Sequence, residues 1–306
     1  MPPSLPFLPS PVMSSRRTFV VIGVSAALAA CSAGTPAPAP DAQPVRMAPA
    51  DTAPAATENG LPAALRDAFV ADDARARAIS FWLQCTPTVA RLRAEGVFGP
   101  AARAPRAIVC QRTADGVPVG GVYDVDSAFS GLRRLQRVRL DGARPKYTEP
   151  VDTAGILRAA RLAREVSVLV SPAWKKRARP FNVVPVSGAN GATEAWVIPR
   201  ATKARSFVTG GDMGYAAPTS SSSAPTLIVD RSATWTQLNL APTGPLRIYS
   251  SVRDIPAVTD LATARFHAEL GRAVTVSTPA LESTLVPGLD PATGARLVWK
   301  HTSLRK

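Results

Sequence analysis

The residues of this chain best able to do chemistry are three cysteines, Cys31, Cys85 and Cys110, and two histidines, His267 and His301. Thiols become acylated, pair as disulfides or bind metals, and imidazoles bind metals or move protons. A metal site is disfavoured, because Cys85 and Cys110 stand far apart in sequence and lack the close ligand pair of zinc sites. The sequence therefore predicts no metal and no cofactor.

His267 is the histidine to consider for catalysis, since it lies in the middle of the folded part. With a serine and an aspartate it could form a hydrolytic triad. The chain has no G-x-S-x-G turn to present such a serine. His267 also lies within a predicted helix, in Phe266-His267-Ala268-Glu269, where we expect a partly exposed surface histidine. No catalytic residue is assigned.

Cys31 stands in a special context near the N-terminus. Ser15-Arg16-Arg17-Thr18 precedes an uncharged segment over residues 18–30, and Leu28-Ala29-Ala30 comes directly before the cysteine. A charged start, an apolar segment and a small-residue cleavage site are the parts of a secretory signal. The uncharged segment is short of the roughly 20 apolar residues that a spanning helix needs, which disfavours a permanent transmembrane anchor.

This N-terminal pattern resembles a bacterial lipoprotein signal with a lipobox. The resemblance implies cleavage before Cys31, acylation of that cysteine and anchoring in a membrane. Arg16-Arg17 with Phe19 also resembles a twin-arginine export motif, although Val21 stands where that motif has a lysine. Twin-arginine export and general secretion remain alternatives, as do Met1 and Met13 as the true start. Ser32, rather than aspartate, after Cys31 favours the outer membrane by the same resemblance, with the protein facing the periplasm.

Export also bears on the other two cysteines. With Cys31 assigned to lipid, Cys85 and Cys110 remain in an oxidising compartment, where such a pair is usually a disulfide. The alternative is two buried free thiols.

The composition divides the chain into three parts: a signal over residues 1–30, a tether over residues 31–61 and one domain over residues 62–306. The tether is rich in proline and alanine, which prevents helices and sheet ladders and favours a disordered leash.

The whole chain carries a formal charge of +14, and only six of its 36 basic residues are lysines. This excess indicates anionic partners, but the coding bias of a GC-rich genome is an alternative explanation.

The sequence predicts an α+β domain, with antiparallel sheets and a few helices packed on one side. Helices are expected from residue 62 to about 83, from Thr86-Pro87 to Gly96, over residues 153–169 and over residues 257–270. Strands are expected over residues 107–112, 117–125, 135–140, 181–186, 194–199, 206–208, 227–229, 235–240, 246–250, 272–276 and 296–299. The Gly210-Gly211-Asp212 cluster predicts a tight turn or bulge.

One basic run is dense enough to be a candidate anion-binding patch: Lys175, Lys176, Arg177 and Arg179. It could contact phosphates of an anionic lipid or of lipopolysaccharide. A solvated charged surface is the plainer alternative, and nucleic acid is an improbable partner for an exported protein.

These observations favour an envelope-anchored lipoprotein that acts by binding or assembly, with anionic lipid, lipopolysaccharide or an envelope protein as partner. A periplasmic hydrolase acting on an envelope polymer or lipid is the alternative.

Overall fold

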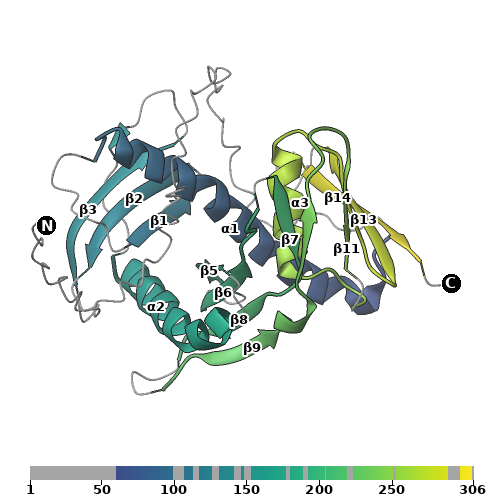
Figure 1. Cartoon of the computed structure of the whole chain (residues 1–306), viewed down its shortest axis with the longest axis horizontal. Coiled ribbons are helices and arrows are strands. Elements are labelled where there is room, and N and C mark those ends of the chain that lie inside the picture. Colours follow the sequence, from purple (N-terminus) through teal and green to yellow (C-terminus); the bar gives the residue numbers. More distant parts are fainter. Residues whose placement is uncertain are drawn as a thin grey trace, which may run out of the picture.

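The computed structural model describes residues 60–98, 107–112, 117–125, 131–140, 146–147, 153–176, 180–188, 192–203, 205–218, 223–250, 253–288 and 297–304. Within them, three α-helices and several sheets form an α+β fold, as the sequence predicts (Figure 1). The sheets are mainly antiparallel.

The long helix α1, Ala63–Ala94, connects the two halves of the molecule (Figure 1). Its first half packs Phe69, Ala76 and Ile79 into a core shared with α3 and the C-terminal strands. Its second half packs Phe81, Val89 and Leu92 against the first sheet. The helix thus contributes buried side chains to two separate hydrophobic cores.

The expected break at Thr86-Pro87 was wrong, because α1 continues through Pro87. Proline removes one backbone donor and costs about 3 kcal/mol in a helix interior. On either side of it, Trp82, Cys85 and Val89 are buried in the cores. Tertiary packing therefore holds the helix where local preference would end it.

The first sheet contains β1 (Ala107–Arg112), β2 (Pro118–Val125), β3 (Leu132–Arg139) and β4 (Lys146–Tyr147), in that order and antiparallel. The bounds of β1 are those predicted, and β3 starts three residues earlier than expected. Ile108, Val122 and Val138 face α1 in this core.

The second sheet has the order β5-β6-β8-β9 and lies between two helices. Its strands are β5 (Phe181–Ser187), β6 (Thr193–Pro199), β8 (Met213–Ala216) and β9 (Thr226–Asp230). On one face Val183, Ala195 and Val197 join the core under α2. On the other face, Val184, Trp196 and Ile198 join the core of α1.

Helix α2, Thr153–Lys176, covers one face of this second sheet. It runs seven residues beyond the predicted end and includes Pro172. Val170 and Trp174, both buried, keep its last turns on the sheet. The lysines Lys175 and Lys176 therefore stand on a helix, where the sequence placed them after one.

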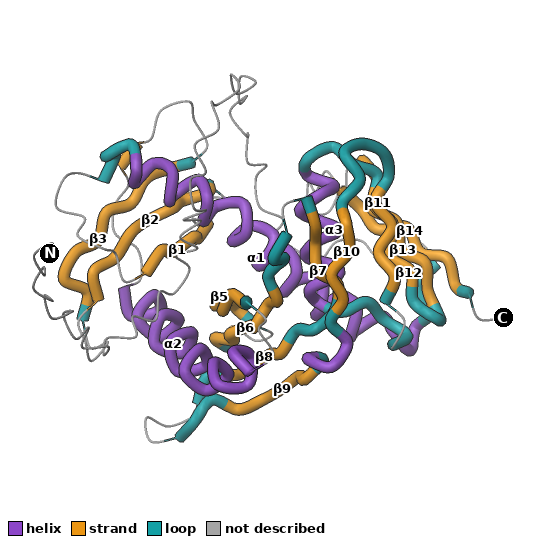
Figure 2. The backbone as a smooth tube through the Cα atoms, in the orientation of Figure 1, coloured by secondary structure: helices purple, strands orange, loops and turns teal. Residues whose placement is uncertain are grey.

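The C-terminal part combines a two-stranded ribbon with a four-stranded sheet (Figure 2). The ribbon pairs β7 (Ser206–Thr209) with β10 (Thr236–Asn239). The sheet contains β11 (Leu246–Tyr249), β12 (Val274–Ser277), β13 (Leu281–Pro287) and β14 (Leu297–Ser303). β11 and β12 are parallel, and α3, Val258–Glu269, makes the crossover between them.

Sequence reasoning did not predict β4, β8 or β13. β8 is four residues long and contains Gly214, which places the Trp196 ring against its backbone. β13 alternates buried Leu281, Ser283 and Leu285 with half-buried neighbours, so its period-two pattern was readable.

Candidate functional site

The interior of the protein contains a network of buried ion pairs centred on α1. Asp73 accepts hydrogen bonds from Arg265 Nε at 2.7 Å and Arg265 Nη2 at 2.8 Å. Trp299 Nε1 donates to the same carboxylate at 2.8 Å, and Arg77 lies 3.3 Å away. One carboxylate therefore joins α1, α3 and β14.

The neighbouring Asp72 starts a second branch. Arg231 spans two carboxylates, donating to Asp72 at 2.9 Å and to Asp212 at 3.0 Å. Arg75 donates to Asp72 at 3.1 Å and, with two nitrogens, to Glu194 at 2.8 and 2.9 Å. Trp196 Nε1 also donates to Glu194 at 2.8 Å. This branch ties α1 to the second sheet and to the segment after β9.

The chain bends at Gly210-Gly211, where the sequence predicts a tight turn or bulge, and this bend delivers Asp212 to the network. Both glycines have positive φ angles, 62° and 80°. The backbone N–H of Gly210 donates to Asp260 Oδ1 at 2.8 Å. A side chain at Gly210 would meet the backbone carbonyl of Thr234 at 2.5 Å. Glycine is needed here for both conformation and space.

Burial and pairing move the acidity of these carboxyl groups in different directions. Burial opposes ionisation of Asp73, but the charges and hydrogen bonds of Arg265 and Arg77 hold its pKa below the ordinary value. Burial raises the pKa of Asp212, and Arg231 offsets that only in part. Burial raises the pKa of Asp260 to about 6. Such a network holds elements together, because Arg265, Arg231 and Arg75 each pair with a carboxylate from another element.

The histidines do not support a hydrolytic centre. His267 is buried and 7% exposed, so the expected surface position was wrong; it packs edge-on to Phe207 because α3 is covered on several sides. His301 Nδ1 lies 2.9 Å from Ser283 Oγ, but both residues are buried in the sheet. Phe69 contacts the His301 ring edge-on at 4.7 Å. This serine–histidine pair is a core contact.

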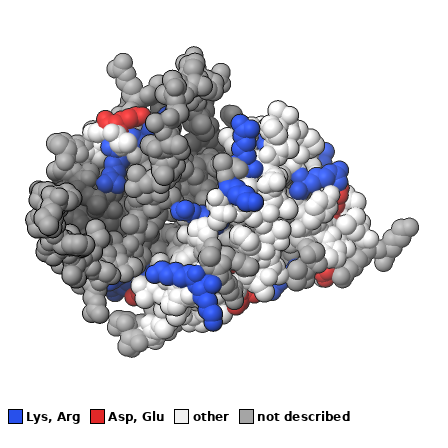
Figure 3. Space-filling model, viewed as in Figure 1, with Lys and Arg blue, Asp and Glu red and all other residues white. Residues whose placement is uncertain are grey.

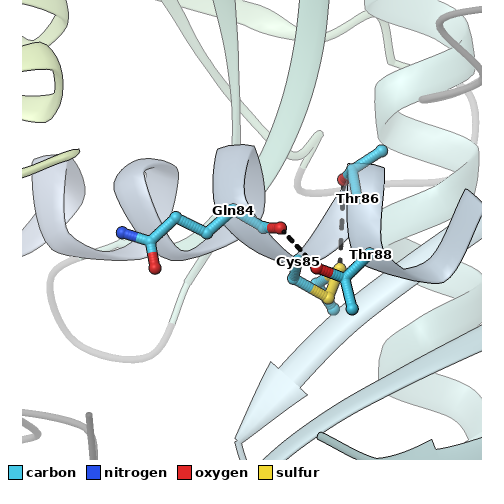
Figure 4. Close-up of a disulfide and its surroundings, with 5 residues drawn as sticks. Gln84, Cys85, Thr86 and Thr88 are labelled. Carbon is cyan, nitrogen blue, oxygen red and sulfur yellow. Dashed lines mark hydrogen bonds between the residues drawn. A yellow bond between two sulfur atoms is a disulfide. The ribbon is translucent and has the colours of Figure 1, made fainter. Parts of the chain in front are cut away.

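The disulfide joins Cys85 of α1 to Cys110 of β1, the pair that the sequence predicts, with Cα atoms 6.0 Å apart (Figure 4). Thr86 Oγ1 lies 3.9 Å from Cys110 Sγ, and Thr88 Oγ1 donates to the Gln84 carbonyl at 3.2 Å. The bond fastens the second half of α1 to the first sheet, beside the core of Phe81 and Val89.

The candidate binding surface is the outer face of α2, which we define by its exposed residues Arg158, Arg161, Val168, Leu169, Pro172, Lys175 and Lys176. Figure 3 shows basic side chains in the region of this helix and at several other places on the same face. Lys175 and Lys176 belong to the predicted anion patch and are exposed on it. Sequence reasoning missed Arg158 and Arg161 as members of this face. The signal that could have identified them is their spacing from Lys175 and Lys176, which places all four on one side of a helix.

Other predicted site residues lie outside the described residues: Cys31, Arg16, Arg17, Arg177 and Arg179. Among the residues described, no group of histidine, cysteine, aspartate or glutamate side chains has the arrangement of a metal site. No helix in the described ranges is long and apolar enough to cross a membrane.

Comparisons with protein-family models, with curated proteins and with solved structures give no match to this chain.

Proposed function

We propose that this chain is exported, acylated at Cys31 and held at the cell envelope, where its α+β domain serves as a binding or assembly module. The observation that carries this proposal is the sequence Leu28-Ala29-Ala30-Cys31 after a charged start and a short apolar segment. Two or more acyl chains hold a protein stably on a membrane, whereas a single chain does so only marginally.

The Cys85–Cys110 disulfide supports export, because disulfides persist in oxidising compartments and are rare in the cytosol. The interior supports a binding role. Its ion pairs join α1 to α3, to β6 and to Arg231, which follows β9. The exposed face of α2, which carries Arg158, Arg161, Lys175 and Lys176, offers a basic surface to an anionic partner.

The test is Cys31→Ala in the cell that makes the protein. We expect the native chain in the membrane fraction, with a mature N-terminus that begins at an acylated Cys31. The variant should leave that fraction or keep an unprocessed signal. A native chain whose mature N-terminus carries an unmodified Cys31 by mass spectrometry would overturn the proposal.

A matched variant, Ser32→Asp, tests the choice of membrane. It keeps Cys31 and should remain acylated. By resemblance to lipoproteins sorted in two-membrane bacteria, it should move from the outer to the inner membrane. Equal distribution of Ser32→Asp and the native chain would refute the outer-membrane assignment while leaving acylation intact.

A further inference from the structure

We infer that the outer face of α2 lies against the surface of an anionic phospholipid bilayer, with its cations at the headgroups and its apolar residues at the acyl boundary. This inference rests on the proposed function, since it names what the anchored domain binds. It adds a specific surface to the acyl anchor at Cys31.

The first support is the order of residue types along α2. Its exposed face begins with Arg158 and Arg161, continues with Val168 and Leu169, and ends with Lys175 and Lys176. Steps of three or four residues place these positions on one side of the helix. From Arg158 to Lys176 the face is about 27 Å long. Only one acidic residue, Glu165, lies between its two basic pairs.

The second support is the exposure of the apolar residues. Val168 is 56% exposed and Leu169 is 53% exposed, although residues 163, 166 and 170 on the opposite side of the helix are buried in the core. Exposed apolar side chains flanked by cations are the pattern of helices that lie in a membrane interface.

The third support comes from the edge strand β9, which continues the same side of the sheet. Leu227 pairs with Tyr215, and Tyr215 belongs to the core under α2, so Leu227 points to the α2 side. Leu227 is 47% exposed and Ile228 is 41% exposed. Four of the seven exposed large apolar residues in the described ranges thus lie on α2 and β9. Figures 1 and 2 show both elements along one border of the molecule.

The anchor permits this orientation. The described chain starts at Gly60, and the tether from Cys31 could extend roughly 85 Å at about 3.1 Å per residue. Charge complementarity then selects the face, because anionic headgroups attract the side with exposed cations and apolar residues.

The test uses the mature chain, residues 31–306, with Cys31→Ala, so that no acyl chain contributes to binding and the whole described structure is retained. Its sedimentation is measured with vesicles of phosphatidylcholine, alone or mixed with phosphatidylglycerol. We expect binding to the anionic vesicles, little binding to the neutral ones, and a steep loss of binding with salt.

Two variants remove the two components of the face. Lys175→Glu with Lys176→Glu should weaken binding to anionic vesicles about tenfold or more. Val168→Gln with Leu169→Gln should also weaken it, without changing the thermal midpoint, since all four residues are exposed. The matched controls are Arg247→Glu with Lys300→Glu, and Leu270→Gln with Leu304→Gln. They likewise reverse two basic charges or replace two apolar side chains by glutamine, at exposed positions in the C-terminal part.

A labelling experiment locates the contact. In the Cys31→Ala chain, Cys85 and Cys110 are bonded, so Leu169→Cys introduces the one free thiol. A polarity-sensitive dye at position 169 should shift its emission to the blue on anionic vesicles. The same dye at Leu304→Cys should not shift.

Several outcomes would overturn the inference: no binding to anionic vesicles, equal losses in the α2 variants and their controls, or equal dye shifts at both positions. Binding to lipopolysaccharide or to an acidic protein, without binding to phospholipid vesicles, would assign the face to that partner and refute the bilayer. Because the assay uses an unacylated chain, its result is separate from the test of acylation at Cys31.

Discussion

Arg265 and Asp73 form a two-pronged ion pair across 192 residues of chain, with both bonds at 2.7–2.8 Å. Arg265 is 1% exposed and Asp73 is fully buried. Arg265 also lies over the Trp299 ring, 5.8 Å from its centre. This pair sets the position of α3 against α1, so the packing of each helix depends on the other.

Asp73→Asn should lower the free energy of unfolding by about 3–5 kcal/mol, because it leaves the buried Arg265 guanidinium without its counter-charge. Urea unfolding measures the loss. Glu95→Ala is the control: it breaks the exposed pair of Arg91 and Glu95 on the same helix and should cost less than about 0.5 kcal/mol. Equal losses in the free energy of unfolding of the two variants would show that the buried pair stabilises the fold no more than the exposed pair does.

Removing the Cys85–Cys110 disulfide should destabilise the protein by roughly 3.5 kcal/mol, the chain-entropy value for the 26-residue loop that it closes. The measurement compares urea midpoints of the native chain and a Cys85→Ala, Cys110→Ala double variant. A reducing agent should shift the native midpoint and leave the double variant unchanged. A reductant-insensitive native chain would contradict this role of the bond.

Gly120 of β2 should be intolerant of a side chain. A methyl group there would overlap Val89 Cγ2 of α1 and lie 3.1 Å from Leu140 Cδ1. We expect Gly120→Ala to cost about 1–3 kcal/mol through overpacking. Val89→Ala should recover part of that loss when the two are combined, because it removes the overlapping methyl group. Strictly additive losses in a double-mutant cycle would contradict the close approach of α1 and β2.

Stability should depend on the protonation of His301. Burial lowers the pKa of His301 to about 4, and the nearby charge of Asp73 offsets this only in part. The unfolded chain binds a proton near pH 6.5, whereas the folded chain resists it until about pH 4. The neutral histidine therefore makes its full contribution to the free energy of unfolding above pH 6.5, and this contribution is lost as the pH falls toward 4.

His301→Gln removes this titration. The stability difference between the native chain and the variant should shift by about 3 kcal/mol toward the variant between pH 7 and pH 4. The pKa of Asp260 is raised to about 6, so protonation of Asp260 stabilises the fold as the pH falls over the same range. Asp260 is present in both proteins, and its contribution therefore cancels in the difference. Urea unfolding at several pH values measures this, and a constant difference would show that His301 is not held neutral.

Local patterns predicted much of the secondary structure. Residues 107–112 form a strand at the expected bounds. Residues 181–186 and 194–199, which flank the turn dipeptide Asn190-Gly191 in the sequence, are strands at nearly the expected bounds. The start of α2 at Thr153 and the extent of α3 also agree. These elements depend on periodicity and turn residues, which neighbouring positions already contain.

The prolines show where local preference was overruled. Pro87 and Pro172 both lie inside helices, because each helix is buried beyond the proline, at Val89 in α1 and at Trp174 in α2. Burial of these side chains outweighs the missing backbone bond. The added turns of α2 are also what place Lys175 and Lys176 in line with Arg158 and Arg161.

The sequence by itself predicts a lipoprotein-type signal before Cys31, and it identified the Cys85–Cys110 pair, the α+β class and the basic charge of the chain. The tertiary structure alone decided that Asp72 and Asp73 are interior residues. In sequence, Asp72-Asp73-Ala74-Arg75 has the composition of a solvated helix face. Its partners Glu194, Arg231 and Arg265 come from 119 to 192 residues away. A charge is buried only when its counter-charge is brought to it, and no local pattern contains that information.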